Sequence, residues 1–580
     1  MLAPLLRVLL TGLALLLFAA AVLFPAQDIE NSRIANRDRL RQEAAHWAAQ
    51  LQPNDDTYVR PLDTPYPISA PKLFRWLLCF DGVLVLAFAA MAPRFKQIPR
   101  RDPNEKIPLN STTALMTCVR HDWPYLLLLT IVAGALRIVG SGRDLWADET
   151  TTLLQYILRP AVDILFQTTS TNNHLLNSLL SHLSITLFGQ DEWAVRLPAI
   201  FFGTATIPLI YLLVRRFSPR VEAALAALML ALSYHHLFFS QDARGYTGMI
   251  FGGLLGTLAL MEALEHGSRR AWAVYCVGMV ICVGSVATGL FVLVGQLIAV
   301  TLLRPNRAFY AMFALVAWLL LHLYFFVIPD ILGGLSDQHM RPEAGWRLSS
   351  GLVQAFLDGL RLGPATIPML VAGGIVVVIG IWSYFRQDRL FAALLLAPEA
   401  LMLLLLAGHG IGVVPRHFIY SLPVVIVFTA RGTRCVVEML PLPLQRWSYA
   451  IAFTGMLAVS TFLLRTWWTF PMQDFRSARR YIESRLQEGD AVVTMGTAEA
   501  GYRYYWPQIP VQNRVSSLQE LMNHSRRVWL LYTFSDDMER RRPKLMQFVR
   551  EKFEEQRVFP GMVVGGEIRV CLYNGSRPIR

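Results

Sequence analysis

Long apolar segments recur along this chain, separated by short loops, and no other feature restricts its fold as strongly. About thirteen of these segments approach the roughly 17–25 apolar residues that cross a bilayer. Hydrophobic residues make up 54% of the 580 positions, and the mean hydropathy is +0.40. A soluble domain has no core large enough to bury that much apolar surface. The sequence therefore predicts a polytopic α-helical membrane protein.

Basic residues gather in alternate loops between these segments, and their placement predicts an orientation. Short cytoplasmic loops carry an excess of lysine and arginine, so we expect the N-terminus inside and the C-terminus outside. The formal net charge of +13 then reflects membrane orientation and does not indicate nucleic-acid binding. Residues 272–303 are too many for one span, and we expect a break near 284–289. The predicted spans are 5–24, 73–92, 125–140, 197–214, 223–239, 246–264, the two parts of 272–303, 309–328, 367–384, 390–407, 418–430 and 449–464.

Three regions of the chain differ in composition, and we expect each to be a separate part of the fold. Residues 1–123 form an N-terminal extension with two spans, the first of which we expect to be an uncleaved anchor. Residues 124–470 form the transmembrane core, with long external loops at 142–192 and 329–366. Residues 471–580 are hydrophilic and are expected to form a small external α/β domain. Its expected helices are 476–486 and 538–555, and its expected strands are 491–494, 528–532 and 567–572.

Two adjacent carboxylates, Asp148 and Glu149, follow the third predicted span and come just before a short helix expected at 151–157. An acid at the start of a helix can satisfy free backbone N–H groups, and one of the two can do so here. Carboxylates that face a cavity between membrane helices are nevertheless usually functional. The pair suits general-base removal of a proton from an acceptor hydroxyl. The second acid would then orient the base, bind the acceptor or hold a divalent cation.

A helix with one leucine-rich face is expected over 172–188, ended by Gly189. Its other face carries polar side chains, and we expect the helix to lie in the membrane interface. Asn173 and His174 stand at its start and are candidate substrate-binding residues. A lone histidine is more often a hydrogen-bonded structural residue than a ligand, so both interpretations stay open.

Arginine on the expected external side runs against the positive-inside rule and is therefore a candidate for anion binding. The turn 240–246 contains Asp242, Arg244 and Tyr246. We expect Arg244 to donate to a phosphate through two nitrogens, with Tyr246 as a second donor. The alternative is an arginine that reaches the interface and pairs with Asp242.

A second external pair, Arg416 and His417, stands at the start of a later span and admits the same two interpretations. Glu399 lies in the middle of a predicted span, where an acid is costly, and we assign it no role. The weaker members of the external cationic set are Arg196, Arg341 and Arg347.

The motifs occur in a fixed order along the chain. They are ALR at 135–137, WADE at 146–149, NNH at 172–174, FG at 188–189, WAVRLP at 193–198 and SQDARGY at 240–246. In this order they resemble the GT-C superfamily of membrane glycosyltransferases, in particular the bacterial dolichyl-phosphate-mannose–protein mannosyltransferase-like and lipid A aminoarabinose transferase-like group. The resemblance is good over about 125–246 and looser as far as 468. The extension departs from the family pattern, in which the acidic loop follows the first span.

This resemblance implies an integral membrane glycosyltransferase that takes a sugar from a polyprenyl-phosphate carrier and passes it, with inversion, to an acceptor hydroxyl. It implies that Asp148 is the catalytic base and Glu149 its companion, and that Arg244 and Arg416 stabilise the leaving phosphate. The acceptor would be lipid A or its core sugar, another cell-envelope glycan, or a protein. The active site and the C-terminal domain would lie on the periplasmic face of the bacterial inner membrane. The resemblance requires no cofactor, and a divalent cation stays an open question.

Two other classes of protein are also compatible with the composition. A polytopic transporter or flippase would carry charges deep in several spans of matched halves, whereas the acids and arginines here gather at one face. A non-catalytic envelope assembly protein would keep the same scaffold and use its C-terminal domain for binding. The sequence does not choose the donor sugar or the acceptor.

Overall fold

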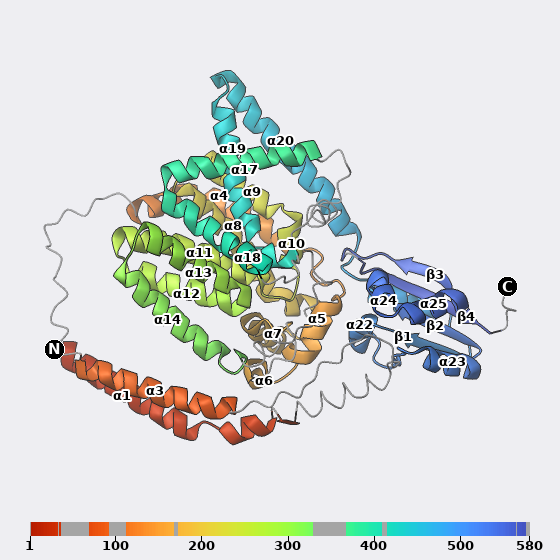
Figure 1. Cartoon of the computed structure of the whole chain (residues 1–580). Coiled ribbons are helices and arrows are strands. Elements are labelled where there is room, and N and C mark those ends of the chain that lie inside the picture. The colour runs from red at the N-terminus through yellow and green to blue at the C-terminus, as the bar shows by residue number, and fades with distance from the viewer. Residues whose placement is uncertain are drawn as a thin grey trace.

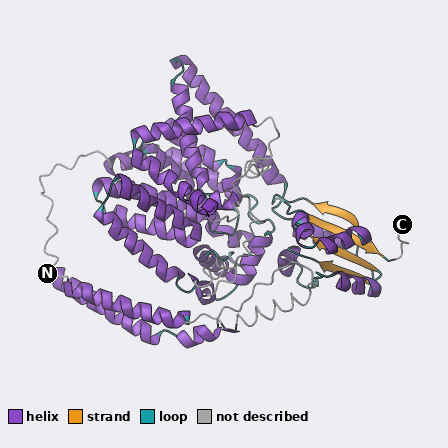
Figure 2. Cartoon of the chain, in the orientation of Figure 1, coloured by secondary structure: helices purple, strands orange, loops and turns teal. Residues whose placement is uncertain are grey.

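The computed structural model consists largely of helices, with one small sheet near the C-terminus (Figure 1, Figure 2). It describes residues 2–32, 34–35, 69–91, 112–166, 172–328, 367–408, 415–563 and 565–575. Within these residues the chain forms an N-terminal pair of helices, a central helical bundle and a C-terminal α/β unit. Figure 1 shows the α/β unit to one side of the bundle, joined to it by α20 (Leu442–Thr469).

The predicted spans fall on helices of the structure, and the span 223–239 is divided between two of them, α9 (Arg220–Ala231) and α10 (Tyr234–Ser240). The break predicted near 284–289 is present, since a single turn of 3-10 helix, η3 (Ala287–Gly289), separates two α-helices there. The N-terminal pair is α1 (Leu2–Leu23) and α3 (Ala70–Met91), and the bundle contains α4 (Thr112–Ile138), α8 (Glu192–Arg215), α9 (Arg220–Ala231), α10 (Tyr234–Ser240), α11 (Tyr246–His266), α12 (Arg269–Ser285), α13 (Leu290–Leu303), α14 (Arg307–Tyr324), α17 (Ile367–Gln387), α18 (Arg389–Gly408), α19 (Ser421–Glu438) and α20.

Among the described helices, four are long and apolar enough to cross a membrane. These are α8, α11, α14 and most of α20. The number rises to six if each of two bent pairs is a single span, and one of these pairs is α9 with α10, bent by 58°. The fold is thus that of a polytopic helical membrane protein, and the count of about thirteen spans stays a prediction.

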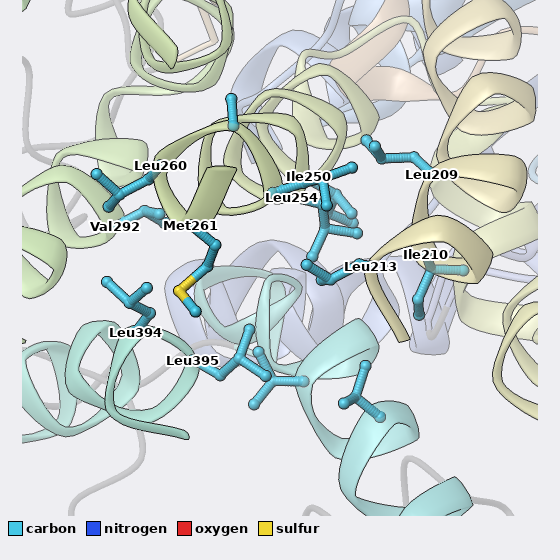
Figure 3. Close-up of a cluster of buried hydrophobic side chains, with 14 of the residues drawn as sticks. Leu209, Ile210, Leu213, Ile250, Leu254, Leu260, Met261, Val292, Leu394 and Leu395 are labelled. Carbon is cyan, nitrogen blue, oxygen red and sulfur yellow. The ribbon is translucent and has the colours of Figure 1, made fainter. Parts of the chain in front are cut away.

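Apolar side chains of α8, α11, α13 and α18 meet inside the bundle (Figure 3). Leu213, Ile250 and Leu254 are completely buried there. The outside of the bundle is apolar as well, and Leu302 for example is 75% exposed. In a bilayer the lipid tails are as apolar as the interior of the bundle, so the hydrophobic effect does not drive helices together, and close packing has to hold them.

Two glycines stand where the backbones of α17 and α19 come into contact. A Cβ atom added at Gly380 would lie 1.9 Å from the carbonyl oxygen of Phe428, and one added at Gly432 would lie 1.9 Å from that of Val376. Small residues at helix crossings let the backbones of membrane helices touch in this way. The two glycines therefore fix the distance between α17 and α19.

We predict that Gly432→Leu separates α17 from α19 and destabilises the protein by about 1–3 kcal/mol, the usual cost of forcing extra atoms into a packed core. The melting temperature of the purified protein in detergent measures this effect. Gly455→Leu on α20 is the matched control, because a Cβ there would meet nothing within 4 Å. An equal loss in both variants would contradict the assignment of Gly432 to the crossing.

The N-terminal pair of helices lies along the outside of the bundle (Figure 1) and is attached to α14 by a polar contact. Asp81 of α3 is only 2% exposed. Its Oδ1 accepts a hydrogen bond from Trp318 Nε1 at 2.9 Å, and its Oδ2 lies 2.6 Å from His322 Nε2. An acid within a membrane helix is costly without such partners, so this contact fixes the extension on the bundle.

Short helices between α4 and α8 build the segment that the sequence predicts to be the first long external loop. They are α5 (Ala147–Thr152), the π-helical turn η2 (Leu153–Ile157), α6 (Ala161–Phe166) and α7 (Leu175–Phe188). Gly189 ends α7 with φ of 92°, as predicted. The polar face of α7 is buried, because Ser181 and Ser184 donate to carbonyl oxygens of α8, whereas Leu183 and Leu187 are exposed.

The C-terminal unit is a four-stranded sheet with helices, in the strand order β1-β2-β4-β3. Strands β1 and β2 are parallel, and the other two pairings are antiparallel. The predicted helix 538–555 is wrong, because Pro543 begins a new helix and the last residues form a strand. The elements are α21 (Phe475–Glu483), β1 (Asp490–Thr494), α22 (Ala498–Tyr505), α23 (Val515–His524), β2 (Arg527–Tyr532), α24 (Ser535–Arg541), α25 (Pro543–Lys552), β3 (Glu554–Phe559) and β4 (Ile568–Asn574).

Candidate active site

The acidic pair lies in the first turn of α5, and not in the loop before the helix as the sequence predicted. Trp146 is the N-cap residue of α5, and the carboxylate of Glu149 accepts its backbone N–H at 3.1 Å. A glutamate three positions after the N-cap commonly makes this contact in a capping box. Glu149 is therefore the member of the pair that caps the helix, and Asp148 is left for another role.

Glu149 is completely buried and forms an ion pair with Arg196 of α8, which is also buried. Arg196 Nη2 donates to Oε2 at 2.6 Å and Arg196 Nε donates to Oε1 at 2.8 Å. Ala243 N–H donates to Oε1 at 2.8 Å. Both oxygens of Glu149 are thus occupied by protein donors, so this carboxylate joins α5, α8 and the turn before α11.

The remaining donors of Arg196 hold the loop that leads into α5. Arg196 Nη1 donates to the carbonyl oxygens of Ser141 and Arg143, and Nη2 donates to that of Asp144. A buried guanidinium needs such a complete set of acceptors. The Glu149–Arg196 pair therefore fixes both the loop and the start of α5.

Asp242 lies in the turn between α10 and α11, behind the acidic pair, and is completely buried. Its Oδ1 accepts from Trp146 Nε1 at 3.3 Å, while Oδ2 has no hydrogen-bond partner. Burial, together with the nearby carboxylate of Glu149, raises the pKa of Asp242 to about 8. A carboxyl group with this pKa is mostly protonated and uncharged at neutral pH.

Asp148 contacts two arginines, Arg244 and Arg416, which the sequence singled out as candidates for phosphate binding. Arg244 Nη1 donates to Asp148 Oδ2 at 2.6 Å, and Arg416 Nη1 lies 3.4 Å from the same oxygen. The side chain of Asp148 is 27% exposed and that of Arg416 is 41% exposed, whereas Arg244 is 3% exposed. Asp148 is thus the accessible carboxylate of the pair. Arg416 belongs to the short helix η5 (Pro415–Phe418).

His174 stands beside Arg244 as the N-cap residue of α7. Its Nδ1 accepts from the backbone N–H of Gly245 at 3.0 Å, and its Nε2 lies 3.2 Å from Arg244 Nη2. Burial and the charge of Arg244 lower the pKa of His174 well below its ordinary value, so the ring is neutral. A neutral imidazole carries one N–H. Because Nδ1 accepts, that hydrogen is on Nε2, and two donors face each other at this point.

Two N–H groups that face each other do not form a hydrogen bond, and their natural common partner is an acceptor such as an anionic oxygen. The other contact of Arg244 Nη2 is to Asn172 Oδ1 at 3.1 Å. The ring of Tyr246 completes this wall, with its centroid 5.3 Å from Arg244 Cζ and 5.2 Å from the His174 ring centroid. The arrangement can therefore bind an anion next to Asp148.

The other predicted site residues are placed as follows. Asn173 is occupied by the protein, because its amide nitrogen donates to the Ile164 carbonyl and its oxygen accepts from Ser178. Glu399 accepts a hydrogen bond from Ser421 on α19. His417 lies on η5, but its side chain is outside the described residues, as are Arg341 and Arg347 of the loop 329–366.

The sequence did not indicate the residues of the C-terminal unit that reach the acidic loop. Gln473 Oε1 accepts from the backbone N–H of Ala147 at 2.8 Å, and the Tyr505 hydroxyl accepts from that of Leu145 at 2.6 Å. These residues follow the acidic loop by more than 300 positions, so no local pattern could have pointed to them.

Both oxygens of Glu149 accept hydrogen bonds from the protein, so Glu149 does not fit a divalent cation. The Asp148 oxygen that faces Arg244 already contacts a guanidinium. Among the described residues there is also no group of three or more His, Cys, Asp or Glu side chains placed to hold a metal ion.

Fold and site together define a polytopic helical membrane protein with an accessible carboxylate that contacts two arginines at one end of the bundle. Residues 175–330 match the sequence model of the family described as dolichyl-phosphate-mannose-protein mannosyltransferase. This match confirms the resemblance that the motifs predicted. No curated protein matches the sequence of the chain.

Three solved structures illustrate what the chain is similar to. ArnT from Cupriavidus metallidurans bound to undecaprenyl phosphate has 13% identity and a TM-score of 0.45, over 77% of this chain and 98% of that one. The Archaeoglobus fulgidus oligosaccharyltransferase has 13% identity and a TM-score of 0.44, over 74% and 71%. The arabinosyltransferase EmbB from Mycobacterium smegmatis has 15% identity and a TM-score of 0.37, over 62% and 34%.

Proposed function

We propose that this protein is an integral membrane glycosyltransferase. It transfers a sugar from a polyprenyl-phosphate donor to the hydroxyl of a lipid A, cell-envelope glycan or protein acceptor, with inversion. The reaction takes place at the periplasmic face of the bacterial inner membrane, where the C-terminal unit also lies. The observation that carries this proposal is the contact of Arg244 and Arg416 with the accessible carboxylate of Asp148, with His174 Nε2 3.2 Å from Arg244.

The charge balance of this cluster supports a singly charged phosphate as its ligand. Glu149 and Arg196 neutralise each other, and His174 and Asp242 are neutral at pH 7. Two arginines, Arg244 and Arg416, then face one carboxylate and leave one unit of positive charge. A sugar linked to a lipid through one phosphate is a phosphodiester with one negative charge. It therefore fits the site better than a neutral sugar does.

The chemistry follows from the same groups. The acceptor oxygen attacks the anomeric carbon from the side opposite the phosphate, and Asp148 removes its proton. The bond between the anomeric carbon and the phosphate oxygen breaks, and its electron pair stays on the phosphate. The leaving phosphate monoester gains a second negative charge, which Arg244 and Arg416 stabilise. Attack from the opposite side inverts the anomeric centre.

Glu149 has a positioning role in this mechanism. Its two oxygens accept four hydrogen bonds from the protein, so it neither contacts the acceptor nor takes up its proton. Asn173, whose amide is likewise occupied, shapes the turn before α7. The groups that contact substrate are Asp148, Arg244, Arg416 and His174, with Tyr246 behind them.

We predict that Arg244→Gln lowers kcat/KM for the donor about 100-fold, since one well-placed donor to a developing charge is worth roughly 3 kcal/mol. Arg244→Lys should lose less, because it keeps the charge but not the two-nitrogen contact with Asp148 and Asn172. Initial rates at varied donor concentration measure both. Unchanged donor kinetics in a folded Arg244→Gln protein would remove Arg244 from the donor site.

Proteoliposomes that contain a labelled polyprenyl-phosphate sugar separate this function from that of a flippase. A transferase converts the donor to polyprenyl phosphate in the presence of an acceptor extract. A flippase moves the intact donor between the leaflets and leaves the phosphate–sugar bond unbroken. Movement without cleavage would overturn the proposal, and cleavage that depends on the acceptor would support it.

A further inference from the structure

Three consecutive backbone N–H groups precede Asp148, and each is held by a side chain. Trp146 N–H is held by Glu149 from within α5. The N–H groups on either side of it, those of Leu145 and Ala147, are held by Tyr505 and Gln473 of the C-terminal segment. The first N–H groups of a helix have no partner within it, so the start of α5 is capped from a distant part of the chain.

Gln473 is fixed on the α/β unit by its other hydrogen bonds. It is completely buried, and its Nε2 donates to Thr533 Oγ1 at 3.0 Å and to the Gly566 carbonyl oxygen at 3.1 Å. Two acceptors on that side require the amide nitrogen to face them. The amide oxygen must then face Ala147. Gln473 is therefore a rigid link between the sheet region and the residue next to Asp148.

Tyr505 of α22 is held in place just as firmly. Its ring stacks on Phe475 with centroids 5.7 Å apart and an angle of 17° between the planes. Its hydroxyl donates to Glu192 Oε1 at 3.3 Å and accepts from Leu145. Because the hydroxyl has one hydrogen, this donor and acceptor pattern fixes its orientation.

An ionic contact and an apolar cluster surround these two links. Arg476 bridges Asp144 and Glu192, and its backbone N–H donates to Asp144 Oδ2 at 2.8 Å. Figure 1 shows α5 and α22 side by side, in agreement with their contacts. The apolar residues shared between the acidic segment and the C-terminal unit are Leu145, Leu153 and Ile157 on one side and Phe475, Tyr502, Tyr505 and Trp506 on the other.

We propose that the C-terminal α/β unit positions the catalytic carboxylate, with Gln473 and Tyr505 as the positioning residues that hold the backbone on which Asp148 is carried. A domain that merely packed against the bundle would need no hydrogen bonds to these particular amides. Here the two hydrogen bonds hold the residues on either side of Trp146. The second of these residues, Ala147, directly precedes Asp148 and is the first residue of α5, a helix of six residues. A small rotation of so short a helix moves its first side chains directly.

The kinetic measurements in this test rest on the proposed function, whereas the hydrogen–deuterium exchange measurement does not. We expect the double variant Gln473→Leu/Tyr505→Phe to lower kcat about 10- to 100-fold, the cost of a displacement of about 1 Å at a catalytic group. Its KM for the donor should change less than about twofold, because Arg244 and Arg416, the arginines proposed to bind the donor phosphate, are not replaced. Hydrogen–deuterium exchange should become faster at the amides of Leu145 and Ala147.

Tyr504→Phe is the matched control. Tyr504 is the neighbour of Tyr505 and also contacts the first external segment, but its hydroxyl donates to the carbonyl oxygen of Gln190, away from α5. It should leave kcat and the exchange of the α5 amides unchanged.

The two readouts separate the possible failures. Faster exchange at Leu145 and Ala147 in the double variant, together with a folded wild type that transfers no sugar, would support the positioning role and overturn the proposed function. Unchanged exchange in the double variant would overturn the positioning role, whatever its kinetics. A loss of kcat equal to that of Tyr504→Phe would overturn it as well, since the effect would then come from the interface in general.

Discussion

Replacement of Asp148 by asparagine should reduce sugar transfer by at least about a thousandfold, within the range that a general base contributes. The amide keeps the shape of the carboxylate but cannot take a proton from the acceptor hydroxyl. Arg244 and Arg416 lose a negative partner at the same time, so the positive charge facing the donor phosphate rises. The KM for the donor should therefore stay the same or fall while kcat falls. Initial rates with saturating acceptor measure both constants.

The matched control for Asp148→Asn is Asp191→Asn at the start of α8, an exposed acid of the segment 142–192 whose side chain makes no cap hydrogen bond. It should transfer at the wild-type rate. Melting temperatures within a few degrees of the wild type would show that both proteins are folded. Asp148→Asn with more than a tenth of wild-type kcat would contradict the assignment of Asp148 as base.

Replacement of Glu149 by alanine should cost about 3–5 kcal/mol of stability, because it leaves the guanidinium of Arg196 buried without its counter-charge. Both side chains of this pair are at most 2% exposed. The loss should appear as a lower melting temperature and a lower yield of folded protein. Activity should fall too, since the start of α5 loses its cap.

A surface pair provides the comparison for Glu149. The side chains of Arg550 and Glu539 are 59% and 46% exposed, and their charged atoms are 2.6 Å apart. Glu539→Ala should cost less than about 1 kcal/mol, because water screens an exposed pair. In Glu149→Ala/Arg196→Met the unpaired charge is removed, and part of the lost stability should return. Equal melting temperatures for Glu149→Ala and Glu539→Ala would contradict the structural role of the buried pair.

Hydropathy and charge were enough to predict the fold class and the segments that form helices, because both signals are local. The acidic pair, Arg244 and Arg416 could be recognised for a related reason. Each breaks a local expectation, either an acid at the end of a span or an arginine on the external side. His174 could be noticed as part of a motif, but its hydrogen-bond state depends on Gly245 and Arg244, 71 and 70 residues away.

The residues themselves do not separate the roles of Asp148 and Glu149, since the two are adjacent and chemically alike, and only the family resemblance implied which of them is the base. What separates them is Arg196, which lies 47 residues further on and faces only one of them. The sequence placed Arg196 in a cationic lining, whereas it is the buried partner of Glu149. Such a pairing becomes visible only when α5 and α8 are seen together.

The polar face of α7 packs against α8, whereas Leu183 and Leu187 are exposed. In lipid an apolar helix face needs no protein partner, so the leucine-rich pattern did not show which face of α7 contacts the bundle. Strand β3 was missed because its sequence, EEQRVF, has only two apolar residues, and its pairing with β4 decides its conformation.

The most direct test of the account is sugar transfer by purified protein from a panel of polyprenyl-phosphate sugars, with an envelope acceptor extract, wild type beside Asp148→Asn. The wild type should consume one donor, release polyprenyl phosphate and form a product with the opposite anomeric configuration. The variant should bind that donor and leave it intact. If a folded wild type leaves every donor untouched, or if both proteins consume the same donor equally, the account of this site is wrong.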